Sequence, residues 1–272
     1  MKNIVLLAGL TALMMSSCEV KEKVSSSNGE PFGMNIACAD FGSVFPGEYN
    51  KDYTYPTDSD LVYWEKKGLK LVRMPFKWER LQYKLDGGLN KHDLEKMKEF
   101  VVAAQKRGIK VLLDLHNYCR RFENGDHRII GTYGITNQNY AGFWKKIASE
   151  FKDYDNIYGY GLMNEPHDLP DSISWFKMAQ LAIDSIRMVD TKNTIVVGGN
   201  SWSSAKRWLT ESDTLKFLKD PAENLMFEAH CYFDKDGSGT YKYSYEEEEG
   251  TPEKGIPVSY THLRAHETLR HL

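Results

Sequence analysis

The residues best suited to chemistry in this sequence lie where short apolar runs end. The run Ile157–Met163 is followed directly by Asn164, Glu165 and Pro166. A carboxyl group at the end of a buried strand can protonate a leaving oxygen if burial raises its pKa. Taken alone, this glutamate could equally be a surface residue that caps the next helix. Asn164 and Glu165 can both reach one site only if the chain bulges there, and Pro166 favours a bulge because it cannot continue a ladder.

Four other apolar runs also carry polar or aromatic residues at or near their ends. Arg73 lies inside the run Leu69–Pro75, where a buried guanidinium needs a carboxylate partner. A single histidine at a strand end is more often a satisfied structural residue, but five such ends in one chain predict a shared site. The residues at the other three ends are His116, Asn117, Tyr118, Asn200, Trp202, His230 and Tyr232.

The elements that must position these residues alternate along the chain. Amphipathic helices are predicted over His92–Lys106, Tyr140–Phe151 and Trp175–Val189. The predicted strands are Gly33–Cys38, Leu69–Pro75, Lys110–Asn117, Ile157–Met163, Thr194–Gly198 and Leu225–Tyr232. Strand and helix in alternation indicate a parallel sheet, and both a doubly wound open sheet and a closed barrel fit.

Two features of the sequence favour the barrel. No glycine-rich phosphate loop follows the first strand, and polar residues cluster at the carboxyl ends of the strands, where barrel active sites lie. The predicted fold class is therefore α/β, a (β/α)8 TIM barrel that is incomplete, because about six of its eight βα units can be counted.

Five short segments carry a resemblance to a known family. RMPF, LDLHNY, GLMNEPH, GNSW and EAHCYFD, in this order, resemble glycoside hydrolase family 5, the cellulase-type enzymes, over residues 32–234. The Arg120–Arg121 and Ile130–Gly131 pairs after LDLHNY resemble the endo-β-1,4-glucanases more than the mannanases or xylanases. The resemblance implies retaining hydrolysis of a β-linked polysaccharide or oligosaccharide by two carboxylates about 5–5.5 Å apart, without a metal or cofactor.

The resemblance also implies roles for individual residues. Glu165 is expected to be the general acid/base, Arg73 to hold and ionise the nucleophile, and Asn164 to bind a sugar hydroxyl. The residues expected to line the catalytic subsite are His116, His230 and Tyr232. The residues expected to contact glucose rings are Asn117, Tyr118 and Trp202.

The second catalytic carboxylate of the family has no match in this sequence. It is expected at the end of the seventh strand, beyond Pro257, with an aromatic platform at the eighth. Glu228 shares a strand face with His230 but is expected one layer deeper, in the barrel interior. Glu246–Glu249 is interpreted as a solvated charge run, and Glu267 lies in the C-terminal tail. We therefore expect the polypeptide as written to fold poorly and to have little or no activity.

The first eighteen residues resemble a bacterial lipoprotein signal. Lys2 precedes an apolar stretch, Ile4–Met15, that is too short to span a bilayer, and Cys18 would be the lipidated residue after cleavage. Plain secretion is the alternative. We expect residues 19–30 to be a flexible tether, 31–257 the barrel and 258–272 a non-native tail. The protein is then secreted and anchored in the bacterial cell envelope, with membrane contact only through Cys18.

Composition excludes some partners and leaves some functions open. A net charge of −3 gives no electrostatic argument for nucleic acid. Cys38, Cys119 and Cys231 lack zinc-ligand spacing and are expected to be buried free thiols, although one disulfide remains possible. The alternatives to a glucanase are another β-glycanase on the same barrel, a catalytically inactive carbohydrate-binding lipoprotein and, more distantly, a nucleotide-binding protein.

Overall fold

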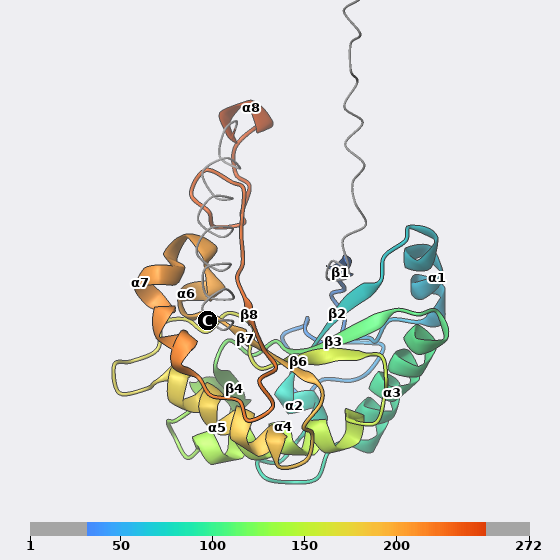
Figure 1. The fold of residues 1–272 in the computed structure, drawn as a ribbon, viewed down its shortest axis with the longest axis horizontal. Coiled ribbons are helices and arrows are strands. Elements are labelled where there is room, and N and C mark those ends of the chain that lie inside the picture. Colours follow the sequence, from blue (N-terminus) through green and yellow to red (C-terminus); the bar gives the residue numbers. More distant parts are fainter. Residues whose placement is uncertain (1–31, 249–272) are drawn as a thin grey trace, which may run out of the picture. The chain divides into compact units, whose positions relative to one another are not determined.

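A curled parallel sheet positions the predicted site. The structure is a computed structural model that describes residues 32–248. Six strands pair in parallel in the order β1-β2-β3-β6-β7-β8, and helices cover the outer face of the sheet (Figure 1). The strands are β1 (Gly33–Asn35), β2 (Leu71–Phe76), β3 (Lys110–Leu115), β6 (Ile157–Gly161), β7 (Thr194–Gly198) and β8 (Leu225–Glu228). This arrangement confirms the prediction of an incomplete (β/α)8 barrel.

The long helices begin where the sequence supplies a capping side chain. Asn90, Thr136 and Ser174 each accept a hydrogen bond from a backbone N–H in the first turn of α3, α4 and α5, respectively. All three predicted helices are present. The helices are α1 (Asp58–Lys66), α2 (Trp78–Leu81), α3 (Lys91–Lys106), α4 (Asn137–Phe151), α5 (Trp175–Arg187), α6 (Asn200–Ser203), α7 (Trp208–Glu211) and α8 (Tyr245–Glu248), with 3-10 turns at Ala205–Arg207 and Asp213–Phe217.

Several predicted strands end earlier than the sequence suggested, with consequences for the site. The strand predicted over Lys110–Asn117 stops at Leu115, and Tyr118 and Cys119 then adopt left-handed backbone conformations. The strand predicted over Leu225–Tyr232 stops at Glu228. After that point the backbone of His230 pairs with the segment that follows α6, and no longer with β7.

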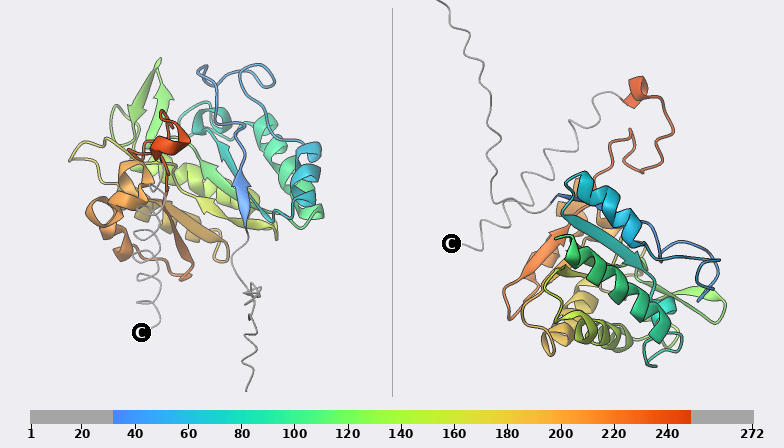
Figure 2. Two further views of the ribbon diagram at one scale, coloured as in Figure 1. Left: turned by 90° about the horizontal axis from the view of Figure 1, so that it is seen from above. Right: turned by 90° about the vertical axis from the view of Figure 1, so that its right-hand side faces the viewer.

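An antiparallel hairpin was missed by the sequence analysis. Strands β4 (Arg120–Glu123) and β5 (Asp126–Ile129) pair across a turn at Asn124 and Gly125, both with positive φ (Figure 2). An Asn-Gly pair is a hairpin signal in itself, because a two-residue turn of this kind needs positive φ at both positions. The hairpin follows the carboxyl end of β3 in the chain, and Arg120 at its start donates to the backbone carbonyl of Tyr118 at 2.7 Å.

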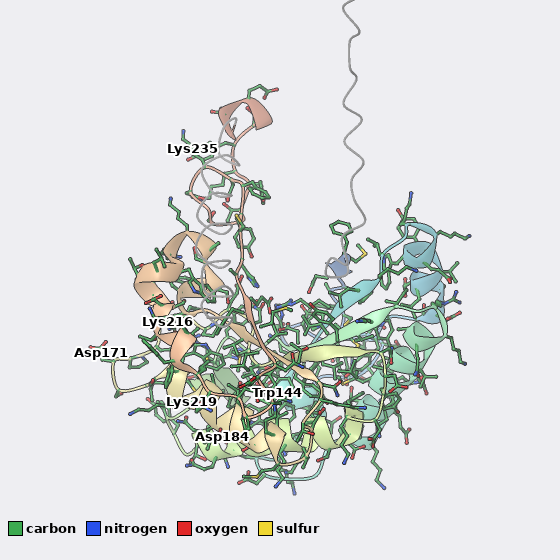
Figure 3. All side chains as sticks on the ribbon, viewed as in Figure 1. Trp144, Asp171, Asp184, Lys216, Lys219 and Lys235 are labelled. Carbon is green, nitrogen blue, oxygen red and sulfur yellow. The ribbon has the colours of Figure 1, made fainter. Side chains whose placement is uncertain are left out.

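The core fills the layer between the sheet and the helices. Its largest fully buried side chains are aromatic, and Trp144 of α4 is one of them, whereas Asp171, Asp184 and Lys219 lie at the outside of the molecule (Figure 3). The aromatic composition therefore serves packing to a large extent. Among the described residues no helix is long and apolar enough to cross a membrane.

The inner face of the sheet is open. In residues 32–248 each edge strand, β1 and β8, pairs with a strand on one side only. A hollow of about 410 Å³ lies against the inner face, and its lining includes Met34, Leu112, Tyr158, Met226 and Phe227. Cys38 and Cys119 are buried free thiols and Cys231 is a half-buried one.

Candidate active site

One pocket lies at the carboxyl ends of the strands and collects most of the predicted residues. Its volume is about 360 Å³. It contains seven predicted site residues, while Asn117 and Trp202 lie outside it. Its lining residues are Asn35, Arg73, His116, Tyr118, Asn164, Glu165, Glu228, His230 and Tyr232.

The chain bulges after β6, as the sequence required. Strand pairing stops at Gly161, Asn164 donates its backbone N–H to the carbonyl of Leu115 at 2.8 Å, and Glu165 has φ +46°. This change of direction, just before Pro166, brings the side chains of Asn164 and Glu165 into the same pocket. The left-handed conformation of Glu165 is one that non-glycine residues rarely adopt, and such conformations concentrate at functional sites.

The Glu165 carboxylate is held by two side chains that follow β8. Nδ1 of His230 lies 2.6 Å from Oε1 of Glu165, and the hydroxyl of Tyr232 donates to the same oxygen at 3.0 Å. Burial raises the pKa of Glu165, but the hydrogen bonds from His230 and Tyr232 outweigh it and leave the pKa below its ordinary value. In this arrangement Glu165 is therefore ionised at neutral pH.

Arg73 finds carboxylate partners, as predicted, but they are residues that the sequence analysis did not assign to the site. Its Nη2 lies 3.0 Å from Asp114 and 3.1 Å from Glu228. The guanidinium also donates to the side-chain oxygens of Asn35 and Asn164, both at 2.7 Å. Burial lowers the pKa of Arg73, yet Asp114 and Glu228 raise it above the ordinary value, so the cation is stabilised.

Glu228 lies at the boundary between the barrel interior and the pocket. Glu228 was expected one layer below the site, but its carboxylate lines the pocket and lies 2.8 Å from Nε2 of His230. Glu228 is the last paired residue of β8, opposite Gly198, and it also lines the hollow against the inner face of the sheet. Asp114 and Asn35 were missed entirely. A signal for Asp114 was present, since an acidic residue inside the buried run Lys110–Leu115 needs a cationic partner.

Each of the two carboxylates that pair with Arg73 also contacts a histidine. Nδ1 of His116 lies 2.8 Å from Asp114, and its Nε2 lies 3.1 Å from the hydroxyl of Tyr118. His230 lies between Glu228 and Glu165. Burial lowers the pKa of His230, but the two carboxylates raise it to about 9. The ring is therefore cationic at neutral pH and donates a hydrogen bond from each nitrogen.

Asn117 does not reach the pocket, which corrects its predicted sugar contact. Its side chain is buried, donates to both carboxylate oxygens of Glu79 at 3.0 and 2.9 Å, and accepts from the backbone N–H of Trp78 at 2.9 Å. Glu79 in turn accepts from the backbone N–H of Phe122 in the hairpin. Asn117 therefore joins α2 to the hairpin, and its amide N–H groups are used by Glu79 and by the backbone carbonyl of Arg120.

Trp202 lies beside the pocket without lining it. Its ring is 38% exposed and stacks on His167, with ring centroids 4.7 Å apart. His167 follows Glu165 closely in the chain and contacts the Tyr118 ring edge to face. An exposed indole at the rim is suited to stacking on a sugar, so the predicted role of Trp202 remains a prediction. Cys18 lies outside the described residues.

Among residues 32–248, no three or more His, Cys, Asp or Glu side chains are arranged so that they could hold a metal ion. The acidic and imidazole side chains of the pocket are instead paired with one another and with Arg73. Within residues 32–248, the Glu165 carboxylate accepts hydrogen bonds from the side chains of His230 and Tyr232. The arrangement is suited to moving protons between a carboxylate and a bound hydroxyl or ether oxygen.

Comparison with known proteins places the chain in one family. The family model described as cellulase (glycosyl hydrolase family 5) matches residues 25–261. The chain therefore belongs to glycosyl hydrolase family 5. It is similar to the manganese dependent endoglucanase Eg5A of Phanerodontia chrysosporium, with 33% identity over 77% of this chain and 54% of that protein. It is also similar to a probable endo-beta-1,4-glucanase B of Neosartorya fischeri, with 35% identity over 77% of this chain and 61% of that protein.

Solved structures give the same result. An endo-beta-1,4-glucanase from Xanthomonas axonopodis pv. citri superposes with a TM-score of 0.79 at 36% identity, over 88% of this chain and 76% of that one. Pseudomonas stutzeri endoglucanase Cel5A, solved with cellobiose, has a TM-score of 0.72 at 39% identity, over 78% of this chain and 62% of that one. The chain spans 54% to 61% of the length of the two curated relatives above.

Proposed function

We propose that this site belongs to a retaining, endo-acting glycoside hydrolase that cleaves β-1,4-linked glucan, with Glu165 as the general acid/base. The observation that carries the proposal is the Glu165 carboxylate, which lies in a pocket at the carboxyl ends of parallel strands and is held by His230 and Tyr232. The substrate class is supported by the similar proteins, several of which are described as endo-beta-1,4-glucanases.

The geometry gives Glu165 and its neighbours distinct tasks. Both hydrogen bonds described for the Glu165 carboxylate reach Oε1, so Oε2 is the oxygen we assign to the glycosidic bond. Protonation of the leaving oxygen and later deprotonation of water use the same group in a retaining mechanism. Asn164, fixed by Arg73 at 2.7 Å, is placed to bind a sugar hydroxyl next to the bond that is cleaved.

The nucleophile of this reaction is proposed to lie beyond Pro257. In the part of the chain that the structure describes, the pocket holds two carboxylates, Glu165 and Glu228. They cannot flank a substrate, because the ring of His230 lies between them and bonds to both. Glu246 and Glu247 are exposed on the short helix α8, and Glu267 lies outside the described residues. We therefore expect residues 32–248 to bind glucan but to hydrolyse little of it.

Substrate class is tested with the whole protein, read from the gene downstream of the codon for Pro257. Release of reducing ends is measured side by side on soluble β-1,4-glucan, β-mannan and xylan. We expect the highest kcat/KM on glucan, and NMR of the first product should show the β-anomer. Preference for mannan or xylan would contradict the substrate, and an α-anomer would contradict retention.

A catalytically inactive carbohydrate-binding lipoprotein is the second candidate. It is favoured if the strand that follows in the gene ends in a neutral residue where the nucleophile is expected. The buried Arg73 argues against it, because sugar binding alone does not require a guanidinium held by two carboxylates. Binding of cello-oligosaccharides without any product release, measured by calorimetry and chromatography on the same sample, would establish this alternative.

We further propose secretion with a lipid anchor at Cys18. The support is the sequence of residues 1–18 alone, which lies outside the described residues. Cys18→Ser should release the protein from the cell envelope into the medium, whereas Cys231→Ser should leave its location unchanged. An anchored Cys18→Ser protein would contradict the proposal.

A further inference from the structure

Glu228 contacts two functional side chains of the pocket and has no role in the mechanism described above. Its carboxylate Oε1 lies 2.8 Å from Nε2 of His230 and 3.1 Å from Nη2 of Arg73. The side chain is largely enclosed, with 17% exposed. A buried carboxylate is costly unless it is paired, so these two contacts define what the residue does.

His230 connects Glu228 to Glu165 through its two ring nitrogens. Nε2 faces Glu228 at 2.8 Å and Nδ1 faces Glu165 at 2.6 Å. A cationic ring can donate to both carboxylates at once, whereas a neutral ring carries a single proton and must leave one nitrogen without a hydrogen. The carboxylate that binds the neutral ring more strongly decides which nitrogen keeps the proton.

We propose that Glu228 is a positioning residue that keeps a proton on Nε2 of His230, so that the mobile proton of the ring is the one on Nδ1 facing Glu165. The inference rests on the proposed role of Glu165 as acid/base. A proton that moves from Nδ1 to Oε1 leaves His230 neutral, with its remaining hydrogen bonded to Glu228, and makes Glu165 a neutral acid. The charge of the three side chains together is −1 before and after this transfer.

Arg73 explains why the ring proton moves to Glu165 and not to Glu228. Burial raises the pKa of Glu228, but the hydrogen bond to His230 and the charge of Arg73 bring it below the ordinary value, so Glu228 stays ionised. Glu165 has no contact of this kind with a guanidinium among the described ion pairs, and its second partner is the neutral hydroxyl of Tyr232. Glu228 is thus the fixed anion, and Glu165 is the carboxyl that can accept the proton.

A second pair in the same pocket offers a matched control. Asp114 contacts Arg73 at 3.0 Å and Nδ1 of His116 at 2.8 Å, in the way that Glu228 contacts Arg73 and His230. Asp114 has no described contact with His230. Asp114→Asn and Glu228→Gln therefore each remove one negative charge beside Arg73, but only the second removes it from the His230 ring.

The test is a ¹⁵N NMR titration of the histidine side chains in the full chain as it exists, without substrate. His230→Gln assigns the His230 signals. The charged and titratable groups that face His230 are Glu165, Glu228, Tyr232 and Arg73, with His116 across the pocket. In the unmodified protein we expect a pKa near 9 for His230 and, above it, a neutral ring protonated on Nε2.

Glu228→Gln should lower the pKa of His230 by about 1–3 and reduce the fraction of neutral ring protonated on Nε2. Asp114→Asn should change the signals of His116 and leave this fraction for His230 unchanged. Glu228→Asp keeps the charge on a shorter side chain, so its fraction of neutral His230 protonated on Nε2 should lie between those of Glu228→Gln and Asp114→Asn. This variant keeps the proposal testable if Glu228→Gln does not fold. An unchanged His230 titration in Glu228→Gln would overturn the proposal. Equal changes of the His230 signals in Glu228→Gln and Asp114→Asn would overturn it as well. Because no substrate is used, failure here is separate from failure of the glucanase assignment.

Discussion

At the scale of single residues, the pocket is built from two histidine–carboxylate pairs that share Arg73. The pairs are His116 with Asp114 and His230 with Glu228. Only the second pair also contacts Glu165. The two pairs are therefore alike in composition, but only the His230–Glu228 pair can pass a proton to Glu165.

The raised pKa of His230 predicts a pH-dependent contribution to stability. The folded-state pKa, about 9, is above the ordinary value of 6.5, so folding favours the protonated ring. This contribution is fully present below pH 6.5 and is lost as pH rises through 9. The free energy of unfolding, measured with urea, should fall over this window by more in the protein than in His230→Gln. If the free energy of unfolding of the protein and of His230→Gln changed with pH in the same way, the ion pairs of His230 with Glu165 and Glu228 would be contradicted.

Sequence reasoning at this scale found residue types more reliably than side-chain directions. Arg73, Glu165 and His230 could be assigned because polar or aromatic residues recur at or near the ends of five apolar runs, whereas each of these residues taken alone has an ordinary structural explanation. Asn117 could not be assigned correctly, because the left-handed turn at Tyr118 and Cys119 decides which side chain enters the pocket. The carbonyl of Cys119 in this turn accepts a hydrogen bond from the backbone N–H of Ile130, just after the hairpin, and this contact is not visible in the local sequence pattern.

At the scale of elements, the hairpin is attached to the barrel through buried polar groups. Glu79 of α2 accepts hydrogen bonds from the Asn117 amide and from the backbone of Phe122. Arg121 of β4 is buried and donates to the carbonyl of Gln82 at 2.8 Å. The hairpin is thus held by side chains that the sequence analysis had assigned to substrate or left unassigned.

Asn117→Ala should destabilise the protein without weakening sugar binding. The change leaves Glu79 and the backbone N–H of Trp78 short of buried partners, at a cost of about 1–3 kcal/mol. Urea denaturation measures the loss, and calorimetry measures the affinity for cellotetraose. Gln138→Ala, an exposed change on α4, is the control and should alter neither. A large loss of affinity with unchanged stability would restore the predicted sugar contact of Asn117.

A buried ion pair links α5 to the segment before β8. Arg187 donates to both carboxylate oxygens of Asp220, at 2.7 and 2.9 Å, and the two side chains are 3% and 1% exposed. Asp220→Asn leaves the guanidinium without a charge partner and should cost about 3–5 kcal/mol in urea denaturation. Asp213→Asn, which breaks a more exposed pair with Lys216, should cost about 1 kcal/mol or less. Equal costs would contradict the structural role of the buried pair.

The helices and central strands were predictable, whereas the ends of the strands and the hairpin were not. Apolar periodicity over 16 residues of α3 and 13 residues of α5 leaves little choice of element. Strands β4 and β5 have four residues each, and polar side chains such as Arg120 and Asp126 hide any alternation. The Asn-Gly turn was the one local signal that could have revealed them.

At the scale of the whole molecule, the described part of the chain presents two sheet edges and an apolar inner face. Sheet edges with unpaired backbone groups promote association between chains. Met34 on β1 is 39% exposed beside the open hollow. Met34→Lys should therefore reduce concentration-dependent association in analytical ultracentrifugation. Val102→Lys, on the outer face of α3 with 37% of the side chain exposed, is the matched control and should have little effect. Equal effects of the two would show that the inner face is not the associating surface.

The measurement that tests the central claim most directly compares the whole protein with Glu165→Gln on two substrates. One is soluble β-1,4-glucan, whose leaving oxygen must be protonated, and the other is dinitrophenyl β-cellobioside, whose leaving group needs no proton. Glu165→Gln should lower kcat/KM on glucan by about 10²–10⁴-fold and largely spare the first turnover of the aryl substrate. Glu99→Gln, with an exposed side chain, should change neither rate. Unchanged glucan hydrolysis by Glu165→Gln would contradict the assignment of Glu165 as the acid/base.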